Sequence, residues 1–279
     1  MSDLIDINPY RQVTQIVKKV LNTNSISWRI LEDSPASGSF NMAVDHTMAV
    51  CLGVGEGVLR LYGWEAPTVS FGRNEPARGH YDLEAAHSAG IKFVRRPTGG
   101  RTVLHDRECT YSIALPVTGS MSSRTIYGVI NEGLIIALGA LGVHAEISST
   151  KGAALRPDAG PCFRKASEGD VTVDGKKLVG SAQVRIGDVI MQHGSILLTS
   201  SQDRLTNLRC GLQGTPNPTC LEEILGRIPP WHIIVERVTE GLSDVLGGEW
   251  HRGMLTKEEE NKMQHFKTHY ASEEWTWGI

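Results

Sequence analysis

The spacing of apolar residues along the chain predicts several amphipathic helices. In the first of them, over residues 9–22, apolar residues recur every three or four positions, and Lys18 and Lys19 lie on the opposite face. Similar spacing predicts helices over residues 39–53, 83–90, 123–142, 231–246 and 256–270. Ser39 is the expected cap of the helix at 39–53, and Thr256 with Glu259 forms a capping-box pattern.

Short alternating runs between these helices predict strands. They cover residues 27–32, 58–64, 68–72, 92–97, 109–115 and 143–147, and the second and third are expected to pair with each other. Asp174-Gly175 and Gly187-Asp188 separate three further alternating runs, as expected for successive hairpins. Hairpins interleaved with helices indicate an α+β fold with a mixed, largely antiparallel sheet.

Composition excludes several classes of protein. The chain has 279 residues and a net charge of −3, which argues against general nucleic-acid binding. No apolar run approaches the roughly 18 residues of a membrane span, and the acidic N-terminus lacks a secretory signal. Five widely spaced cysteines without a C-x-x-C pair favour a reducing, cytoplasmic setting. The histidines show no H-E-x-x-H motif, and no metal site is expected.

The sequence RRPTGGRTVLHD, residues 95–106, follows a predicted strand directly. Gly99 and Gly100 permit a tight turn with exposed backbone N–H groups. Three arginines and His105 surround this turn, which suits an anionic ligand, although a hairpin turn with solvated arginines has the same pattern.

A second candidate segment is DGKKLVGSAQ, residues 174–183. Consecutive strand residues point to opposite faces, so one of Lys176 and Lys177 should face inward. The small residues that follow, Gly180, Ser181 and Ala182, would let a ligand approach closely. The alternative is that both lysines are surface charges beside a turn.

Cys162 lies in a long loop, where neither helix nor strand packing explains a cysteine. The 15 residues from Cys162 to Lys177 are enough for the chain to return and bring the two side chains together. A nearby cation favours the nucleophilic thiolate. An inert, half-buried thiol is the alternative for Cys162.

Together, RRPTGGRTVLHD, Cys162-Phe163, DGKKLVGSAQ and QHGSILL resemble the lipoate/biotin protein ligase and acyltransferase superfamily. Within it the sequence is most similar to cysteine-dependent octanoyltransferases of protein lipoylation. The resemblance implies a mixed sheet with an acyl tunnel and three parts of the chain: an N-terminal helical extension (1–25), a catalytic domain (26–200) and a C-terminal tail packing on it (201–279).

The resemblance also implies roles for individual residues. Cys162 matches the nucleophile that takes an octanoyl group from octanoyl-acyl carrier protein, and Lys177 matches the family's catalytic lysine. Arg96, Gly99, Gly100 and His105 match the substrate-cradling loop. Backbone N–H groups near Gly180 are candidates for stabilising the oxyanion. The acceptor would be the lysine of a lipoyl domain, such as glycine cleavage H protein or a 2-oxoacid dehydrogenase E2.

Two alternatives remain open. Gly72-Arg73-Asn74 resembles a stretch of lipoate ligases in which the arginine helps bind the acyl-adenylate. An ATP- and Mg²⁺-dependent lipoate–protein ligase is therefore the second hypothesis, whereas the transferase would need no cofactor. The third is a non-catalytic protein that binds a lipoyl domain or an acyl carrier. We expect a monomer that binds neither nucleic acid nor membranes.

Overall fold

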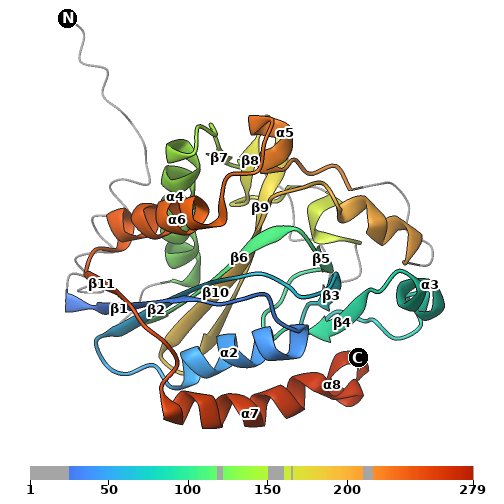
Figure 1. The fold of residues 1–279 in the computed structure, drawn as a ribbon, viewed down its shortest axis with the longest axis horizontal. Helices are drawn as coiled ribbons and strands as arrows, with labels where there is room; N and C mark the ends of the chain where they lie inside the picture. Colours follow the sequence, from blue (N-terminus) through green and yellow to red (C-terminus); the bar gives the residue numbers. More distant parts are fainter. Residues whose placement is uncertain (1–24, 118–121, 150–159, 165, 210–215, 279) are drawn as a thin grey trace, which may run out of the picture.

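The structure, a computed structural model, describes residues 25–117, 122–149, 160–164, 166–209 and 216–278. Its main element is an eight-stranded sheet (Figure 1). The strands in spatial order are β11 (Glu249–Arg252), β1 (Ser27–Glu32), β2 (Glu56–Tyr62), β6 (Glu108–Pro116), β10 (Val189–Leu197), β9 (Lys176–Ile186), β8 (Val171–Val173) and β7 (Glu146–Ile147). β1 runs parallel to both neighbours, and the other pairs are antiparallel. The predicted fold class is confirmed, while the helix predicted over 9–22 lies outside the described residues.

A second, three-stranded sheet has the order β4 (Lys92–Arg95), β3 (Thr68–Phe71) and β5 (Val103–His105). The predicted pairing of 58–64 with 68–72 is therefore wrong, because β2 and β3 belong to different sheets. Val69 and Phe71 of β3 pack into a separate apolar cluster. The Pro67 carbonyl, just before β3, accepts a hydrogen bond from the N–H of Lys92 in β4 and not from β2. The chain after β2 thus turns away to build a wall facing the larger sheet.

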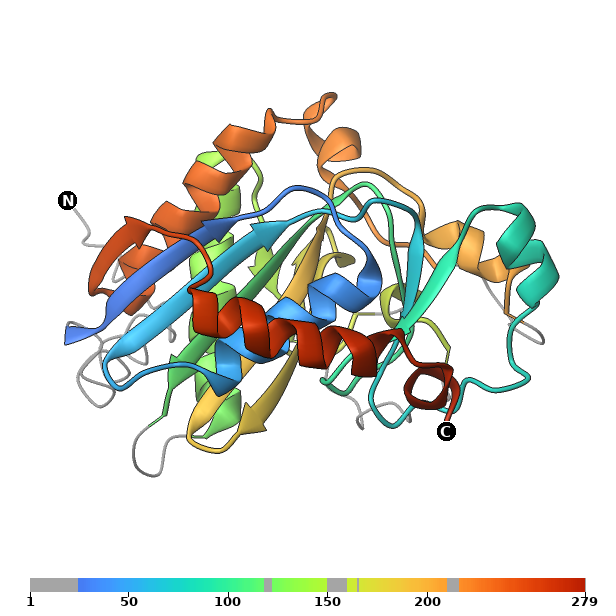
Figure 2. The same cartoon turned by 60° about the horizontal axis from the view of Figure 1, so that its bottom comes forward.

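Helices cover both faces of the eight-stranded sheet (Figure 1). On one face lie α4 (Ser123–Ala140) and α6 (Trp231–Leu246), which pack on alternate residues of β2 and β6. On the other face lie α2 (Gly38–Val50) and α7 (Lys257–Ala271), with α7 running along α2 (Figure 2). A Cβ at Gly241 would lie 2.3 Å from the Gly133 carbonyl oxygen, so α4 and α6 cross with their backbones in contact.

Shorter elements complete the fold. They are α3 (Leu83–Ser88), α5 (Leu221–Leu225), α8 (Glu273–Trp277) and the 3₁₀ turns η2 (Cys162–Arg164) and η3 (Gln202–Asn207). The predicted capping box of Thr256 and Glu259 is confirmed. The predicted cap Ser39 is wrong, because the Ser37 hydroxyl accepts the hydrogen bond from Phe40 N and Ser39 lies in the first turn.

Candidate active site

Cys162 and Lys177 meet at the edge of a pocket between the two sheets. Cys162 begins η2, where its N–H donates to the Thr102 carbonyl at 2.8 Å. Phe163, the next residue, is fully buried and anchors the turn. Lys177 is the inward-facing lysine of β9, 3% exposed, whereas Lys176 is exposed. The Lys177 Nζ lies 3.2 Å from the Cys162 Sγ, so the structure brings the two predicted residues together.

Lys177 contacts two acidic groups at once. Its Nζ is also 2.8 Å from the Asp170 Oδ2. Burial alone would lower the pKa of Lys177, but Cys162 and Asp170 together raise it above its ordinary value. The ammonium form is therefore stabilised next to the sulfur, and a cation in this position favours the thiolate.

Asp170 was not identified in the sequence. Lys177 pairs with Thr172 in the β8–β9 hairpin, and Asp170 directly precedes β8. The hairpin predicted at Asp174-Gly175 brings these two segments side by side, but the sequence does not show the register shift between Val171 and Thr172.

Glycines allow the backbone to approach the pair closely. A Cβ at Gly180 would lie 2.8 Å from Phe163 Cζ and 3.1 Å from Lys177 Cε. Gly100 has φ of +89°, and a Cβ at Gly72 would lie 1.9 Å from the Gly100 carbonyl oxygen. Only glycine fits this second contact, so the 72–74 and 98–101 loops are packed backbone against backbone.

The arginines near the Gly99-Gly100 turn do not form an open basic patch. Arg95, Arg96 and Arg101 are all buried. The Arg96 guanidinium donates to the carbonyls of Ser70, Gly99 and Arg101 and to the Ser70 hydroxyl. Arg95 donates to carbonyls from the 72–75 loop and from α8. The alternative of solvated arginines at a hairpin turn is therefore wrong, because these side chains are buried and hold loops together.

Arg101 holds the cysteine loop specifically. Its guanidinium donates to the Pro161 carbonyl at 3.0 Å and to the Cys162 carbonyl at 3.3 Å. Together with the bond from Cys162 N to Thr102 O, these contacts attach η2 to the segment that follows Gly100. Arg73, by contrast, is exposed and does not line the pocket.

The pocket runs inward from Cys162 between the two sheets. Gly180 of β9, Ser195 of β10, Thr110 of β6 and Tyr62 of β2 lie opposite one another in register and form its floor. Val103 and Ser70 from the smaller sheet and Met42 from α2 face it from the other side. Ser181, Ala182, Gly100, Arg96 and His105, all singled out in the sequence, also line the pocket, whereas Gly99 does not.

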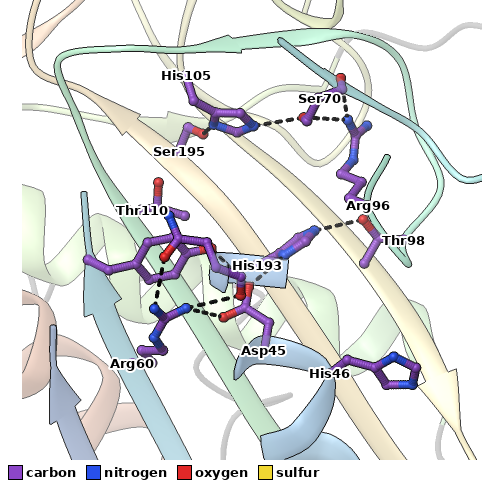
Figure 3. Close-up of polar contacts among 12 residues, drawn as sticks. Asp45, His46, Arg60, Ser70, Arg96, Thr98, His105, Thr110, His193 and Ser195 are labelled. Atoms are coloured by element: carbon purple, nitrogen blue, oxygen red, sulfur yellow. Dashed lines mark hydrogen bonds and ion pairs between the residues drawn. The ribbon is translucent and has the colours of Figure 1, made fainter. Parts of the chain in front are cut away.

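Buried polar chains stiffen the pocket wall (Figure 3). His105 bonds to Ser70 at 2.7 Å through Nε2 and to Glu108 at 2.8 Å through Nδ1. His193 bridges Thr98 at 2.7 Å and Asp45 at 3.0 Å, and burial lowers the pKa of His193. Both histidines thus support the walls of the pocket.

Other kinds of site find no support in the described parts of the chain. Within those residues no group of histidine, cysteine and carboxylate side chains could hold a metal ion. No helix among them is long and apolar enough to cross a membrane. The four cysteines that the structure describes, Cys51, Cys109, Cys162 and Cys220, are free thiols.

Comparison with known proteins identifies the family. The model of the lipoyl protein ligase A/B catalytic domain matches residues 37–242. This chain belongs to that family. Family relatives include octanoyltransferase LipM of Kyrpidia tusciae, which is 37% identical over 272 residues covering 90% of this chain and 98% of that protein. Octanoyltransferase LipM of Bacillus subtilis is 32% identical over the same shares of the two chains.

Solved structures of lipoate ligases have the same fold as this family member. A lipoate-protein ligase A bound with ATP has a TM-score of 0.77 at 20% identity, covering 91% of this chain and 99% of that chain. A bipartite lipoate protein ligase from Thermoplasma acidophilum, described together with its E2 lipoyl domain, has a TM-score of 0.75 at 19% identity. The match covers 91% of this chain and 97% of that chain. At these identities the likeness shows the fold alone.

Proposed function

We propose that this protein transfers an octanoyl group from octanoyl-acyl carrier protein to the lysine of a lipoyl domain through a thioester on Cys162. The observation that carries the proposal is the 3.2 Å contact between Cys162 and the buried Lys177 at a pocket between two sheets. The similarity to octanoyltransferases LipM over nine-tenths of the chain supports it.

In the first half of the reaction, the Cys162 thiolate attacks the carbonyl carbon of the donor thioester. A new C–S bond forms to Cys162, and the bond to the carrier's thiol breaks. The Lys177 ammonium stabilises the thiolate before attack and then gives its proton to the departing thiolate. Backbone N–H groups near Gly180 stabilise the oxyanion that forms between these events.

In the second half, the acceptor's lysine amine attacks the Cys162 thioester. The new C–N bond becomes an amide, the C–S bond breaks, and Cys162 leaves as a thiolate. The amine's proton passes to the now neutral Lys177, which restores the starting pair of charges. No proton or electron remains unaccounted for after one complete cycle.

The pocket is lined by four adjacent strands, and this span is comparable with the length of a medium-length acyl chain. Adjacent strands are about 4.8 Å apart, so β6 lies about 10 Å from β9 across the floor. An extended octanoyl group has seven C–C bonds, each of which advances the chain by about 1.2 Å, so the group is about 8 Å long. Burying the chain contributes roughly 0.8 kcal/mol per CH₂, or about 5–6 kcal/mol before any costs.

The surroundings of the pocket favour a transferase over an ATP-dependent ligase. Arg96 and Arg101 donate to protein carbonyls, and Lys177 pairs with Asp170, so these three cations already have partners. The exposed Arg73 is the feature that favours the ligase, in which it would contact the acyl-adenylate. We propose that the reaction needs no ATP, and that the acceptor is a lipoyl domain such as that of glycine cleavage H protein or E2.

The test replaces Cys162 with serine and follows octanoyl transfer to a lipoyl domain without ATP. We expect Cys162→Ser to abolish transfer, and Cys51→Ser, which changes a cysteine at the end of α2, to retain it. Full activity of Cys162→Ser with lipoate, ATP and Mg²⁺ would overturn the proposal in favour of the ligase. Binding of a lipoyl domain by a wild-type protein with no turnover would favour the non-catalytic alternative.

A further inference from the structure

Asp170 is held rigidly beside Lys177. It directly precedes β8, is 5% exposed, and its Oδ2 accepts from Lys177 Nζ and from Ser167 N, each at 2.8 Å. The backbone beside it is also fixed, because the Asn131 side chain donates to the Gly169 carbonyl at 2.8 Å. The carboxylate therefore has a defined, buried place next to Lys177.

Lys177 faces few other charges from the elements packed around it. The Phe163 ring of η2 lies 5.2 Å from the Lys177 Nζ, and Arg96 interacts electrostatically with Cys162. Tyr127 of α4 is close to both Asp170 and Cys162, but burial raises its pKa and keeps the phenol neutral. Among the described residues, the Asp170 carboxyl group and the Cys162 sulfur are thus the acidic groups in contact with Lys177.

We propose that Asp170 is a positioning residue of the transfer reaction, holding the Lys177 amine at the Cys162 sulfur and keeping it a base for the second half-reaction. This inference rests on the proposed function. It concerns the stage at which Cys162 carries the octanoyl group and no longer carries a charge.

Acylation removes one of the two anions beside Lys177. Burial alone would then favour the neutral amine strongly and weaken its affinity for the acceptor's proton. The Asp170 carboxylate remains and stabilises the ammonium that forms when Lys177 takes this proton from the attacking amine. The carboxylate itself neither gains nor loses a proton, so the balance of the reaction is unchanged.

The test separates base-dependent from base-independent discharge of the acyl-enzyme. Octanoyl-Cys162 enzyme is prepared with octanoyl-acyl carrier protein and mixed either with a lipoyl domain or with hydroxylamine, which is a neutral nucleophile near pH 7 and needs no base. We expect Asp170→Asn to slow transfer to the lipoyl domain about tenfold to a hundredfold and to leave discharge by hydroxylamine unchanged. Asp170→Glu, which keeps the charge, should recover part of the loss.

The ratio of the two rates is independent of how much enzyme is folded, because both are measured on the same preparation. Asp188→Asn, in an exposed hairpin turn, is the matched control and should keep the wild-type ratio. The inference would be overturned if Asp170→Asn kept the wild-type ratio, either with both rates unchanged or with both rates reduced by the same factor. If wild-type enzyme forms no acyl adduct, it is the proposed function that fails.

Discussion

At the scale of single residues, Trp64 separates the acyl pocket from a second cavity. Its ring stacks on His105 with centroids 4.0 Å apart, and its Nε1 donates to Thr110 at 2.8 Å. It lines both the pocket that begins at Cys162 and an outer cavity lined by Asp33, Glu108 and Trp231, among others. Trp64 thus forms the far wall near the place where an eight-carbon chain would end.

We predict that Trp64→Ala shifts the preferred acyl chain length upward. Removing the indole joins the pocket to the outer cavity, so decanoyl and dodecanoyl chains gain room that the wild-type pocket denies them. Rates with octanoyl-, decanoyl- and dodecanoyl-acyl carrier protein measure this preference. Trp231→Ala, which alters the outer cavity alone, should keep the wild-type order of rates. An unchanged order in Trp64→Ala would show that another residue limits the chain.

Part of the site could be predicted at this scale. The alternation of Lys176 and Lys177 predicted that one of the two faces inward, the family resemblance selected Lys177, and the placement of Cys162 in a loop marked it as unusual. The role of the arginines could not be predicted. The sequence does not show that the Arg96 guanidinium donates to the carbonyl of Ser70, 26 residues away. Solvated and buried arginines have the same sequence pattern, and only the three-dimensional arrangement of the loops distinguishes them.

At the scale of elements, α7 is attached to α2 through a neutral histidine. His46 stacks on Phe266 with ring centroids 4.0 Å apart, and its Nδ1 lies 3.0 Å from the Tyr270 hydroxyl. Burial, assisted by His269 and Arg73, lowers the pKa of His46 to about 4. A proton on Nδ1 would remove the acceptor for Tyr270, so protonation opposes the docking of α7.

We predict that acid weakens the protein through His46. The unfolded chain binds a proton near pH 6.5 and the folded one near pH 4, so stability is complete above pH 6.5 and falls toward pH 4. The fall in Tm between pH 7 and pH 5 should therefore be smaller in His46→Gln than in wild type. His87→Gln, at an exposed position of α3, should fall as wild type does. An equal fall in His46→Gln would contradict the assignment.

Helices were easier to predict than short strands. The apolar period gives α6 and α7 within a residue or two, because each helix carries its own pattern. β11 and β5 were missed, since four and three residues are too few for an alternation to be recognised. β11 forms only where the C-terminal segment meets β1, more than 200 residues earlier in the chain.

At the scale of the whole molecule, the C-terminal segment supports the active-site loops. The Trp275 indole donates to the Arg95 carbonyl, and the Arg95 guanidinium donates to carbonyls of Trp275 and Thr276. The same guanidinium binds the Gly72 and Glu75 carbonyls, so it links α8 to the loop against which Gly100 packs. The cysteine site therefore depends on contacts from the C-terminal end of the described chain.

The central claim is that Cys162 carries the acyl group during transfer. The most direct measurement is the intact mass of the protein after incubation with octanoyl-acyl carrier protein in the absence of ATP. The account predicts one octanoyl adduct, localised to Cys162, removed by hydroxylamine and discharged by a lipoyl domain. An unmodified mass for wild-type protein that nevertheless acylates the lipoyl domain, or an adduct that persists in Cys162→Ser, would contradict it.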